Sequence, residues 1–410
     1  AVIGGGMAGI LTALLLHERG VRAVVLEAGR VGSGTTSCTT AKITSQHGAI
    51  YAGLIERFGR EKAQQYARAN QRAVESYARV VKQYDIGCDF EKTDAILYSH
   101  AHEEVMRREA EAAQSLGLPA SFTNRLALPL RISGAVRFTE QAQFHPLKFL
   151  SAIADELTIY ENTPVRRLEK GAAVTDRGVI RADAFVVATH FPFLNKHGSY
   201  FLKLYQQRSY VLALENAPAL RGMYLDEREN GLSFREYDGR LILGGGGHRT
   251  GHEGGGWNAL EQFAKTHYPD ARITHRWAAQ DCMSLDGVPY IGRYSAMTPN
   301  LYVASGFNKW GMTTSMVAAQ LLTDIITGKK SPYEAVFSPS RSMLHAQLGV
   351  NAVEAGKNLL TVSPRRCPHL GCALKWNPQE RSWDCPCHGS RFEENGRLID
   401  NPATKNLRSH

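Results

Sequence analysis

The sequence predicts a mixed α/β (α+β) protein with three parts: a Rossmann-like nucleotide-binding domain, an antiparallel-sheet domain inserted into it, and a small all-β module at the C-terminus. A short apolar run, a glycine-rich turn and an apolar helix open the chain. Strand and turn patterns dominate roughly residues 120–250, and four of the seven cysteines lie close to the C-terminus. These three observations give the three parts.

Length and composition restrict the function. The 410 residues can bury a large core, and 43% hydrophobic residues is typical of a globular protein. The net charge of +9 is spread along the chain without a basic block, which argues against nucleic acid as a partner. No apolar run is long enough to span a bilayer. Sparse cysteines followed by one dense group favour a cytoplasmic protein with a local metal site.

The first residues, "AVIGGGMAGI", form a βαβ opening. Residues 1–3 predict a strand, residues 7–19 an apolar helix that ends before Gly20, and residues 23–26 a second buried strand that ends at Glu27. Within this context the first glycines match the dinucleotide-binding fingerprint G-x-G-x-x-G. We therefore expect a dinucleotide at the start of the helix.

Each glycine of the fingerprint has a physical task. Gly4 and Gly6 permit a tight turn and the close approach of a pyrophosphate to the helix N-terminus, and Gly9 lets helix and strand pack closely. Glu27, about twenty residues further on, is placed to accept hydrogen bonds from ribose hydroxyls.

Further elements follow in order. Apolar positions at helical spacing predict helices over residues 61–84 and 102–116. "FVVATH" (residues 185–190) predicts a buried strand, and "GRLILGGGGHRTG" (239–251) a strand that runs into a flexible loop. Residues 300–328 predict a strand, a glycine-containing turn and a long helix that ends at Gly328.

The C-terminal clusters "CPHLGC" (residues 367–372) and "CPCHGS" (385–390) admit three interpretations. One cysteine and one histidine from each could bind structural zinc, although the spacing is tighter than in zinc fingers. Two disulfides would leave both histidines unused. A 2Fe–2S centre with two cysteines on one iron and two histidines on the other is the interpretation that leaves none of the six residues unexplained.

The two clusters resemble the cluster-binding loops of Rieske proteins. The resemblance implies that Cys367 and Cys385 ligate one iron, that His369 and His388 ligate the other, and that Cys372 and Cys387 form a disulfide. It also implies that the Ser390 hydroxyl binds a bridging sulfide, and that Phe392 replaces a hydrogen-bonding tyrosine, which would lower the potential. One feature departs from the family, because few residues precede Cys367. Either the module is short and leans on the rest of the chain, or a segment is absent.

The first 330 or so residues resemble the FAD-dependent D-amino-acid oxidase superfamily, which includes glycine oxidase and sarcosine oxidase. The matching segments are "VIGGGMAGI", "VVLEAG", "FVVATH", "DGVPYIG" and "NLYVASGFNKWGMT". The glycine turn would bind the pyrophosphate, residues 39–42 the flavin ring and ribityl chain, and the segment 306–313 the pyrimidine end. Val165 would meet the adenine. The implied cofactor-binding residues are Gly4, Gly6, Met7, Ala8, Glu27, Ala28, Thr39, Thr40, Lys42, Val165, Ala188, Thr189, Gly306, Trp310, Gly311, Met312 and Thr313.

The catalytic candidates are Lys309, in the flavin-facing turn, and His248 and Arg249, which end a strand and could hold a carboxylate. A surface loop is an equal alternative for the last two. His47 and His190 are interpreted as structural histidines. Cys282 lies near the place where sarcosine oxidases attach flavin covalently, but its register does not match.

The expected domain limits follow from these motifs. The FAD-binding domain takes residues 1–85, 145–195 and 275–332, the substrate domain 86–144 and 196–274, a linker 333–360 and the Rieske module 361–410. The expected activity is oxidation of the C–N bond of an amine or amino acid at FAD. Electrons would then pass singly through the cluster to an external acceptor. Two alternatives stay open: a reductase that runs in the opposite direction, and a module that serves as a redox sensor or docking domain.

Overall fold

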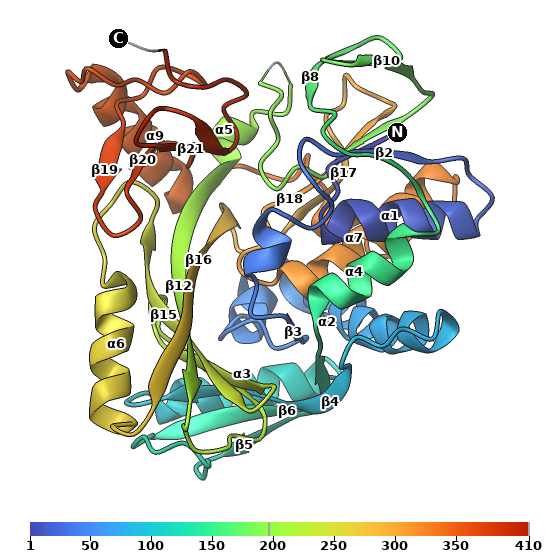
Figure 1. Cartoon of the computed structure of the whole chain (residues 1–410). Helices are drawn as coiled ribbons and strands as arrows, with labels where there is room; N and C mark the ends of the chain where they lie inside the picture. Colours follow the sequence, from blue (N-terminus) through green and yellow to red (C-terminus); the bar gives the residue numbers. More distant parts are fainter. Residues whose placement is uncertain (196, 409–410) are drawn as a thin grey trace.

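Two large sheets and a small C-terminal sheet organise the chain in the computed structural model (Figure 1). The structure describes residues 1–195 and 197–408. The predicted domain limits at 196 and 410 fall outside the described residues. The observed architecture confirms the predicted α/β class, with a small all-β module at the C-terminus. No helix in the described ranges is both long and apolar enough to cross a membrane.

A six-stranded sheet in the order β17-β18-β11-β1-β2-β7 forms the nucleotide-binding core. Its central strands pair in parallel, and only the edge strand β17 is antiparallel to its neighbour. The central strands β1 and β11 are short, fully buried apolar runs, as expected for a sheet covered by helices on both faces, whereas the edge strand β7 is largely exposed. The strands are β1 (Val2–Ile3), β2 (Val24–Leu26), β7 (Thr158–Tyr160), β11 (Phe185–Val187), β17 (Tyr290–Arg293) and β18 (Leu301–Ser305).

A nine-stranded sheet forms the second domain. Its order is β16-β12-β15-β14-β13-β4-β6-β3, with β5 paired to β6. Its long strands β12 and β16 run antiparallel along their whole length and reach towards the C-terminal module (Figure 1). The strands are β3 (Lys42–Ile43), β4 (Glu91–Ser99), β5 (Ala120–Thr123), β6 (Gly134–Gln143), β12 (Leu204–Glu215), β13 (Met223–Asp226), β14 (Ser233–Tyr237), β15 (Arg240–Arg249) and β16 (Arg272–Ser284).

The helices pack on these two sheets. In the nucleotide-binding domain α1 packs against α7, and in the second domain α6 lies on β12 and β15. The bounds are α1 (Met7–Glu18), the 3₁₀ turn η1 (Thr35–Cys38), α2 (Tyr51–Gln83), α3 (Glu103–Ser115), α4 (Pro146–Ala154), α5 (Tyr200–Lys203), α6 (Gly256–His267), α7 (Gly311–Ile326), α8 (Glu334–Phe337) and α9 (Ala346–Leu360). A separate three-stranded sheet contains β8 (Val165–Glu169), β9 (Ala172–Thr175) and β10 (Gly178–Arg181).

Several boundaries differ from the sequence prediction. Helix α2 begins at Tyr51, ten residues before the predicted start at 61, and continues past Gly59, whose φ of 80° interrupts the helical backbone. The strand β15 continues through its glycines to Arg249, where a flexible loop was expected, and α6 begins shortly after it. The strand β16 crosses the predicted limit at residue 274 and stays in the nine-stranded sheet to Ser284.

The C-terminal module contains a four-stranded antiparallel sheet, β19-β20-β21-β22. The strands are β19 (Lys375–Asn377), β20 (Ser382–Asp384), β21 (Arg391–Glu393) and β22 (Leu398–Asp400). All four follow the first cysteine cluster, and the predicted linker contains α8 and α9 instead of strands. Helix α9 buries Asn351 and Asn358 and exposes Val353 and Leu360. The Asn351 side chain donates to the Leu202 carbonyl at 3.2 Å, so a polar face of α9 packs against the nine-stranded domain.

Candidate functional site

The glycine turn between β1 and α1 brings three backbone segments together. Gly4 has a φ of 113°, and a Cβ at this position would lie 2.4 Å from the carbonyl oxygen of Ala188 at the end of β11. A Cβ on Gly9 would lie 1.9 Å from the Gly4 carbonyl oxygen. Only glycine tolerates such close approach, so helix, turn and strand β11 pack backbone to backbone.

Glu27 faces this turn, as the sequence predicted for a ribose-binding carboxylate. Its Oε2 accepts a hydrogen bond from the Gly5 N–H (2.6 Å), and its Oε1 accepts one from the Gly29 N–H (2.7 Å). The Thr36 hydroxyl accepts from the Met7 N–H at 3.2 Å. The start of α1 thus combines backbone donors, a positive helix end and an acidic strand end, which fits a dinucleotide.

The segment predicted to line the flavin ring lies between the two domains. The Lys42 ammonium donates to the Thr40 hydroxyl at 3.1 Å and lies 3.5 Å from the Ser233 hydroxyl of β14. Burial, with a smaller contribution from the Arg235 guanidinium, lowers the pKa of Lys42 to about 7. Arg235 also donates a hydrogen bond to the Ala41 carbonyl. Two residues of β14 in the inserted domain therefore contact this loop.

The second predicted ring segment, residues 306–313, is a turn that leads into α7. Gly306, Asn308 and Lys309 all have positive φ values, which hold the chain in a tight turn before the helix begins at Gly311. The Thr313 hydroxyl donates to the Thr44 carbonyl and accepts from the Thr44 N–H, both at 2.9 Å. The turn is therefore attached to the strand that carries Lys42, and the two predicted ring segments are neighbours.

A cavity of about 290 Å³ opens beside this turn. Asn308 and Trp310 line it from the turn, Tyr205 and Met283 from strands β12 and β16, and His47 from the loop before α2. No lysine, arginine, aspartate or glutamate is among the described residues that line it. Its size and apolar-aromatic walls suit a small organic molecule.

His47 is a structural histidine, as expected. Its Nδ1 lies 2.7 Å from the Tyr66 hydroxyl and its Nε2 2.8 Å from the Thr44 carbonyl oxygen, and its ring stacks on Trp310 with centroids 4.7 Å apart. Burial lowers the pKa of His47 to about 3. The ring therefore stays neutral and supports Trp310.

His190 and Cys282 lie nearby in different surroundings. His190 follows Thr189 at the end of β11, with a φ of 65°; burial lowers its pKa, and Asp281, Asp400 and a hydrogen bond with the Gln206 side chain partly oppose this shift. Burial raises the pKa of the Cys282 thiol to about 12, and the thiol lies 3.6 Å from the Ser305 hydroxyl. This thiol is buried and protonated at neutral pH.

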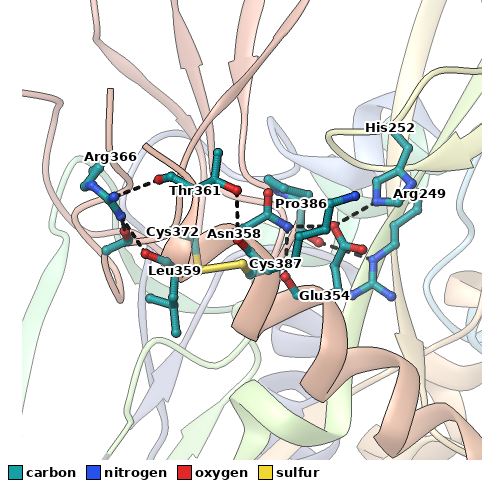
Figure 2. The surroundings of a disulfide bond; sticks show 12 residues. Arg249, His252, Glu354, Asn358, Leu359, Thr361, Arg366, Cys372, Pro386 and Cys387 are labelled. Carbon is teal, nitrogen blue, oxygen red and sulfur yellow. Dashed lines mark hydrogen bonds and ion pairs between the residues drawn. A yellow bond between two sulfur atoms is a disulfide. The ribbon is translucent and has the colours of Figure 1, made fainter. Parts of the chain in front are cut away.

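The structure places Lys309 in the turn before α7 and the adjacent candidates His248 and Arg249 at the end of β15. The Lys309 ammonium donates to the Glu229 carbonyl at 3.3 Å, beside the inserted domain. Arg249 donates to the Pro386 carbonyl at 3.2 Å (Figure 2). It also donates to the Asn351 side chain of α9 at 3.0 Å. His248 lies 2.9 Å from the Tyr210 hydroxyl. Arg249 thus contacts the C-terminal module, and its guanidinium also lies over the ring of the cavity-lining Tyr205, 4.9 Å from the ring centroid.

The module brings the predicted iron ligands together. The His369 and His388 rings lie with centroids 4.8 Å apart, and the Nδ1 atoms of both are buried without a partner. Burial lowers the pKa of His369 to about 4 and that of His388 to about 3, so both rings are neutral, as metal ligation requires. Hydrogen bonding with the Cys385 thiol lowers the pKa of Cys367 to about 7. Two free Nδ1 atoms beside two buried thiols fit a 2Fe–2S cluster with mixed ligands.

A disulfide joins Cys372 of the first ligand loop to Cys387 of the second (Figure 2). The polar face of α9 lies against it, where the Asn358 carbonyl accepts from the Ala373 N–H at 2.9 Å. Ser390 is fully buried and its hydroxyl lowers the pKa of Cys367, and Phe392 is fully buried in the same cluster of residues. The two ligand loops are held as one unit.

A buried ion network that the sequence did not reveal joins this unit to the nine-stranded sheet. Arg208 of β12 forms a bidentate ion pair with Glu380, and Glu380 also accepts from Arg391 at 2.8 Å. The exposed side-chain fractions of Arg208, Glu380 and Arg391 are 3%, 9% and 6%. Burial alone would raise the pKa of Glu380, but the two guanidinium groups hold it below its ordinary value.

The histidine side of the module faces the nucleotide-binding domain. The Asn195 Oδ1 accepts a hydrogen bond from the His369 Nε2–H at 2.9 Å. The Phe191 ring lies edge-on to both histidine rings, with centroids 6.4 and 6.2 Å away. The Asn401 amide donates to the carbonyls of Thr189 (2.6 Å) and Phe191 (3.0 Å). The segment that follows β11 therefore contacts both the glycine turn and the iron-ligand loops.

Comparison with known proteins agrees with this geometry. A family model described as FAD dependent oxidoreductase matches residues 1–325, and a Rieske [2Fe-2S] domain model matches residues 339–410. The chain belongs to the FAD dependent oxidoreductase family. The oxidoreductase binds FAD in its first part and a 2Fe–2S cluster in its second.

The relatives include one with the same two parts. The Rieske 2Fe-2S iron-sulfur protein YhfW of Bacillus subtilis is 35% identical over 473 aligned residues, which cover 99% of this chain and 92% of the relative. Because the alignment is longer than the 410 residues of the oxidoreductase, the relative has internal residues without a counterpart here. The gamma-glutamylputrescine oxidoreductase of Escherichia coli is 22% identical over 82% of this chain and 84% of the relative.

Among solved structures, glycine oxidase from Geobacillus kaustophilus superposes with a TM-score of 0.70 and 20% identity. The match covers 83% of this chain and 98% of that one. It supports the fold of the flavin part.

Proposed function

We propose that the oxidoreductase oxidises the C–N bond of an amine or amino acid and passes the electrons singly through its Rieske centre to an external acceptor. FAD accepts two electrons from a substrate, and the cluster carries one at a time. The observation that carries the proposal is the contact of the iron-ligand loops with the segment after β11, through Phe191 and Asn401. One short segment links the two cofactor sites.

The substrate class rests on the relatives and on the cavity. The relatives named for glycine and for gamma-glutamylputrescine support an amino acid or an amine. The cavity beside Trp310 can bind the apolar part of such a molecule. Lys309 is the catalytic candidate that lies in the flavin-facing turn itself. We retain the predicted flavin contacts of Thr39, Thr40 and Lys42 as part of this proposal. A cytoplasmic location stays a prediction from the cysteine pattern.

The test is an anaerobic absorbance time course with purified holoenzyme and a panel of amines and amino acids. We expect one substrate to bleach the flavin band first and the cluster band afterwards. His388→Cys should leave flavin bleaching intact and abolish reduction of an added one-electron acceptor. If no substrate bleaches the flavin, and a reduced carrier fills the cluster first, the enzyme works as a reductase and the proposed direction is wrong. Equal loss of both reactions in His388→Cys would indicate a structural or sensing module.

A further inference from the structure

Two buried glutamines lie on neighbouring strands between the flavin part and the module. Gln206 of β12 and Gln280 of β16 are 1% and 4% exposed. In the register of the two strands Gln206 pairs with Cys282 and Arg208 pairs with Gln280, so all four side chains lie on one face. Arg208 points from this face to the module, where it binds Glu380. The two glutamines therefore face the iron-ligand loops.

Both glutamines bind consecutive carbonyls of the second ligand loop. The Gln206 amide donates to the carbonyl oxygen of His388 at 2.7 Å, and the Gln280 amide donates to that of Gly389 at 2.8 Å. A Cβ on Gly389 would lie 2.6 Å from the Gln206 Cβ, and Gly389 has a φ of 82°. Glycine at this position permits the loop to approach the strand pair closely enough for both bonds.

The same strand pair contacts the flavin part. The Thr35 hydroxyl, in the turn η1 that precedes the predicted ring segment, lies 3.4 Å from the Gln280 carbonyl oxygen. On the opposite face of the pair, the Ser209 hydroxyl donates to Asp281 at 3.0 Å, and Tyr205 and Met283 line the cavity beside Trp310. One face of the strand pair thus borders the cavity, and the other binds the loop that carries His388.

We propose that Gln206 and Gln280 are positioning residues for electron transfer: by holding the His388–Gly389 carbonyls, they fix the cluster against the strand pair that walls the flavin site. The inference rests on the proposed function. The transfer moves one electron from reduced flavin to the oxidised cluster, and no bond to either glutamine forms or breaks. The glutamines act on distance and orientation, because a buried carbonyl that loses its donor must shift to find another.

The test uses full-length holoenzyme and needs no substrate. Flavin is photoreduced anaerobically with EDTA as electron donor, and the subsequent change of the cluster band is followed in Gln206→Leu and Gln280→Leu. We expect photoreduction at the normal rate and transfer slowed about tenfold in each variant, equivalent to about 1.4 kcal/mol. The control is Gln114→Leu, which removes a 2.8 Å amide bond from an exposed glutamine to the Ala120 carbonyl, away from both sites. This variant should transfer electrons at the normal rate.

Two further readouts do not depend on turnover. The g values of the reduced cluster in electron paramagnetic resonance should shift in both variants, and protease should release the module faster. If a leucine variant loses its cluster, Thr250→Val provides the test of the proposal. The Thr250 hydroxyl orients Gln280 by donating a 3.0 Å hydrogen bond to its Oε1. This variant should show a smaller change in the same direction.

The outcomes separate the two proposals. If the wild-type enzyme shows no transfer from flavin to cluster, the proposed relay fails. If the wild-type enzyme transfers and all three variants match its rate and its g values, the relay stands and the assignment of the glutamines is wrong.

Discussion

At the N-terminus a cofactor cradle is built from the backbone of residues 4–9, whereas at the C-terminus the ligand loops are held in place by side chains far away in the sequence. Gly4 and Gly9 are neighbours along one β–α turn, but Gln206 and His388 are 182 positions apart. The first arrangement depends on the absence of side chains. The second depends on buried polar groups that must all be paired, so we expect it to be more sensitive to the loss of one partner.

The largest effect should come from the ion network. Glu380→Ala leaves Arg208 buried without its carboxylate, which should cost about 3–5 kcal/mol in the free energy of unfolding. The urea midpoint of the module and its release by protease would measure this. Glu394→Ala, which removes the exposed partner of Arg381, should cost no more than about 1 kcal/mol. Equal midpoints for the two variants would contradict the view that the network holds the module.

An alanine substitution tests the close packing of the glycine turn. Gly9→Ala places a methyl group 1.9 Å from the Gly4 carbonyl oxygen, so helix α1 must shift. We expect a destabilisation of about 1–3 kcal/mol and loss of bound FAD, measured as the flavin content of purified protein. Gly53→Ala in α2 meets nothing within 4 Å and should retain FAD. A fully loaded Gly9→Ala protein would show that the close packing is dispensable.

The buried His47, which stacks on Trp310 of the flavin-facing turn, should make the free energy of unfolding depend on pH. Its folded pKa of about 3 lies below the ordinary value of 6.5, so the unfolded chain binds a proton that the folded protein does not. The stability it contributes is complete above pH 6.5 and falls by about 1.4 kcal/mol per pH unit as the pH drops towards 3. His47→Gln should flatten this slope in urea unfolding between pH 6 and 4. His275→Gln, at an exposed position, should keep the wild-type slope.

The smallest effect concerns the potential of the cluster. Phe392→Tyr adds a hydroxyl in the fully buried cluster of residues that contains Cys367 and Cys385. If the hydroxyl donates to a ligand sulfur, it stabilises the reduced cluster and raises the midpoint potential. A redox titration followed by absorbance measures this. An unchanged or lower midpoint would mean that the hydroxyl finds a different partner.

Local signals made much of both sites predictable. Residues 4–9 lie in one turn whose glycine spacing reflects the close approach of backbone segments. Each ligand cluster spans only six residues, so the spacing of its cysteines and histidine is visible in the sequence. The two histidine rings do lie in contact in the structure. Predictions that needed long-range pairing were weaker. The strand β16 extends beyond the limit at 274 because its partner β12 continues, and partner strands are not visible in a local pattern.

The sequence by itself determined the two cofactors, because phosphate cradles and iron ligands require particular residue types at short, fixed spacing. Only the tertiary structure decided how the two sites are joined. Arg249 and His248 resemble substrate-binding residues in the sequence, and only the fold shows that Arg249 contacts both Pro386 of the module and the ring of the cavity-lining Tyr205. Gln206 and Gln280 carry no local signal at all, since a glutamine becomes a loop-holding residue only when folding buries it opposite an unpaired carbonyl.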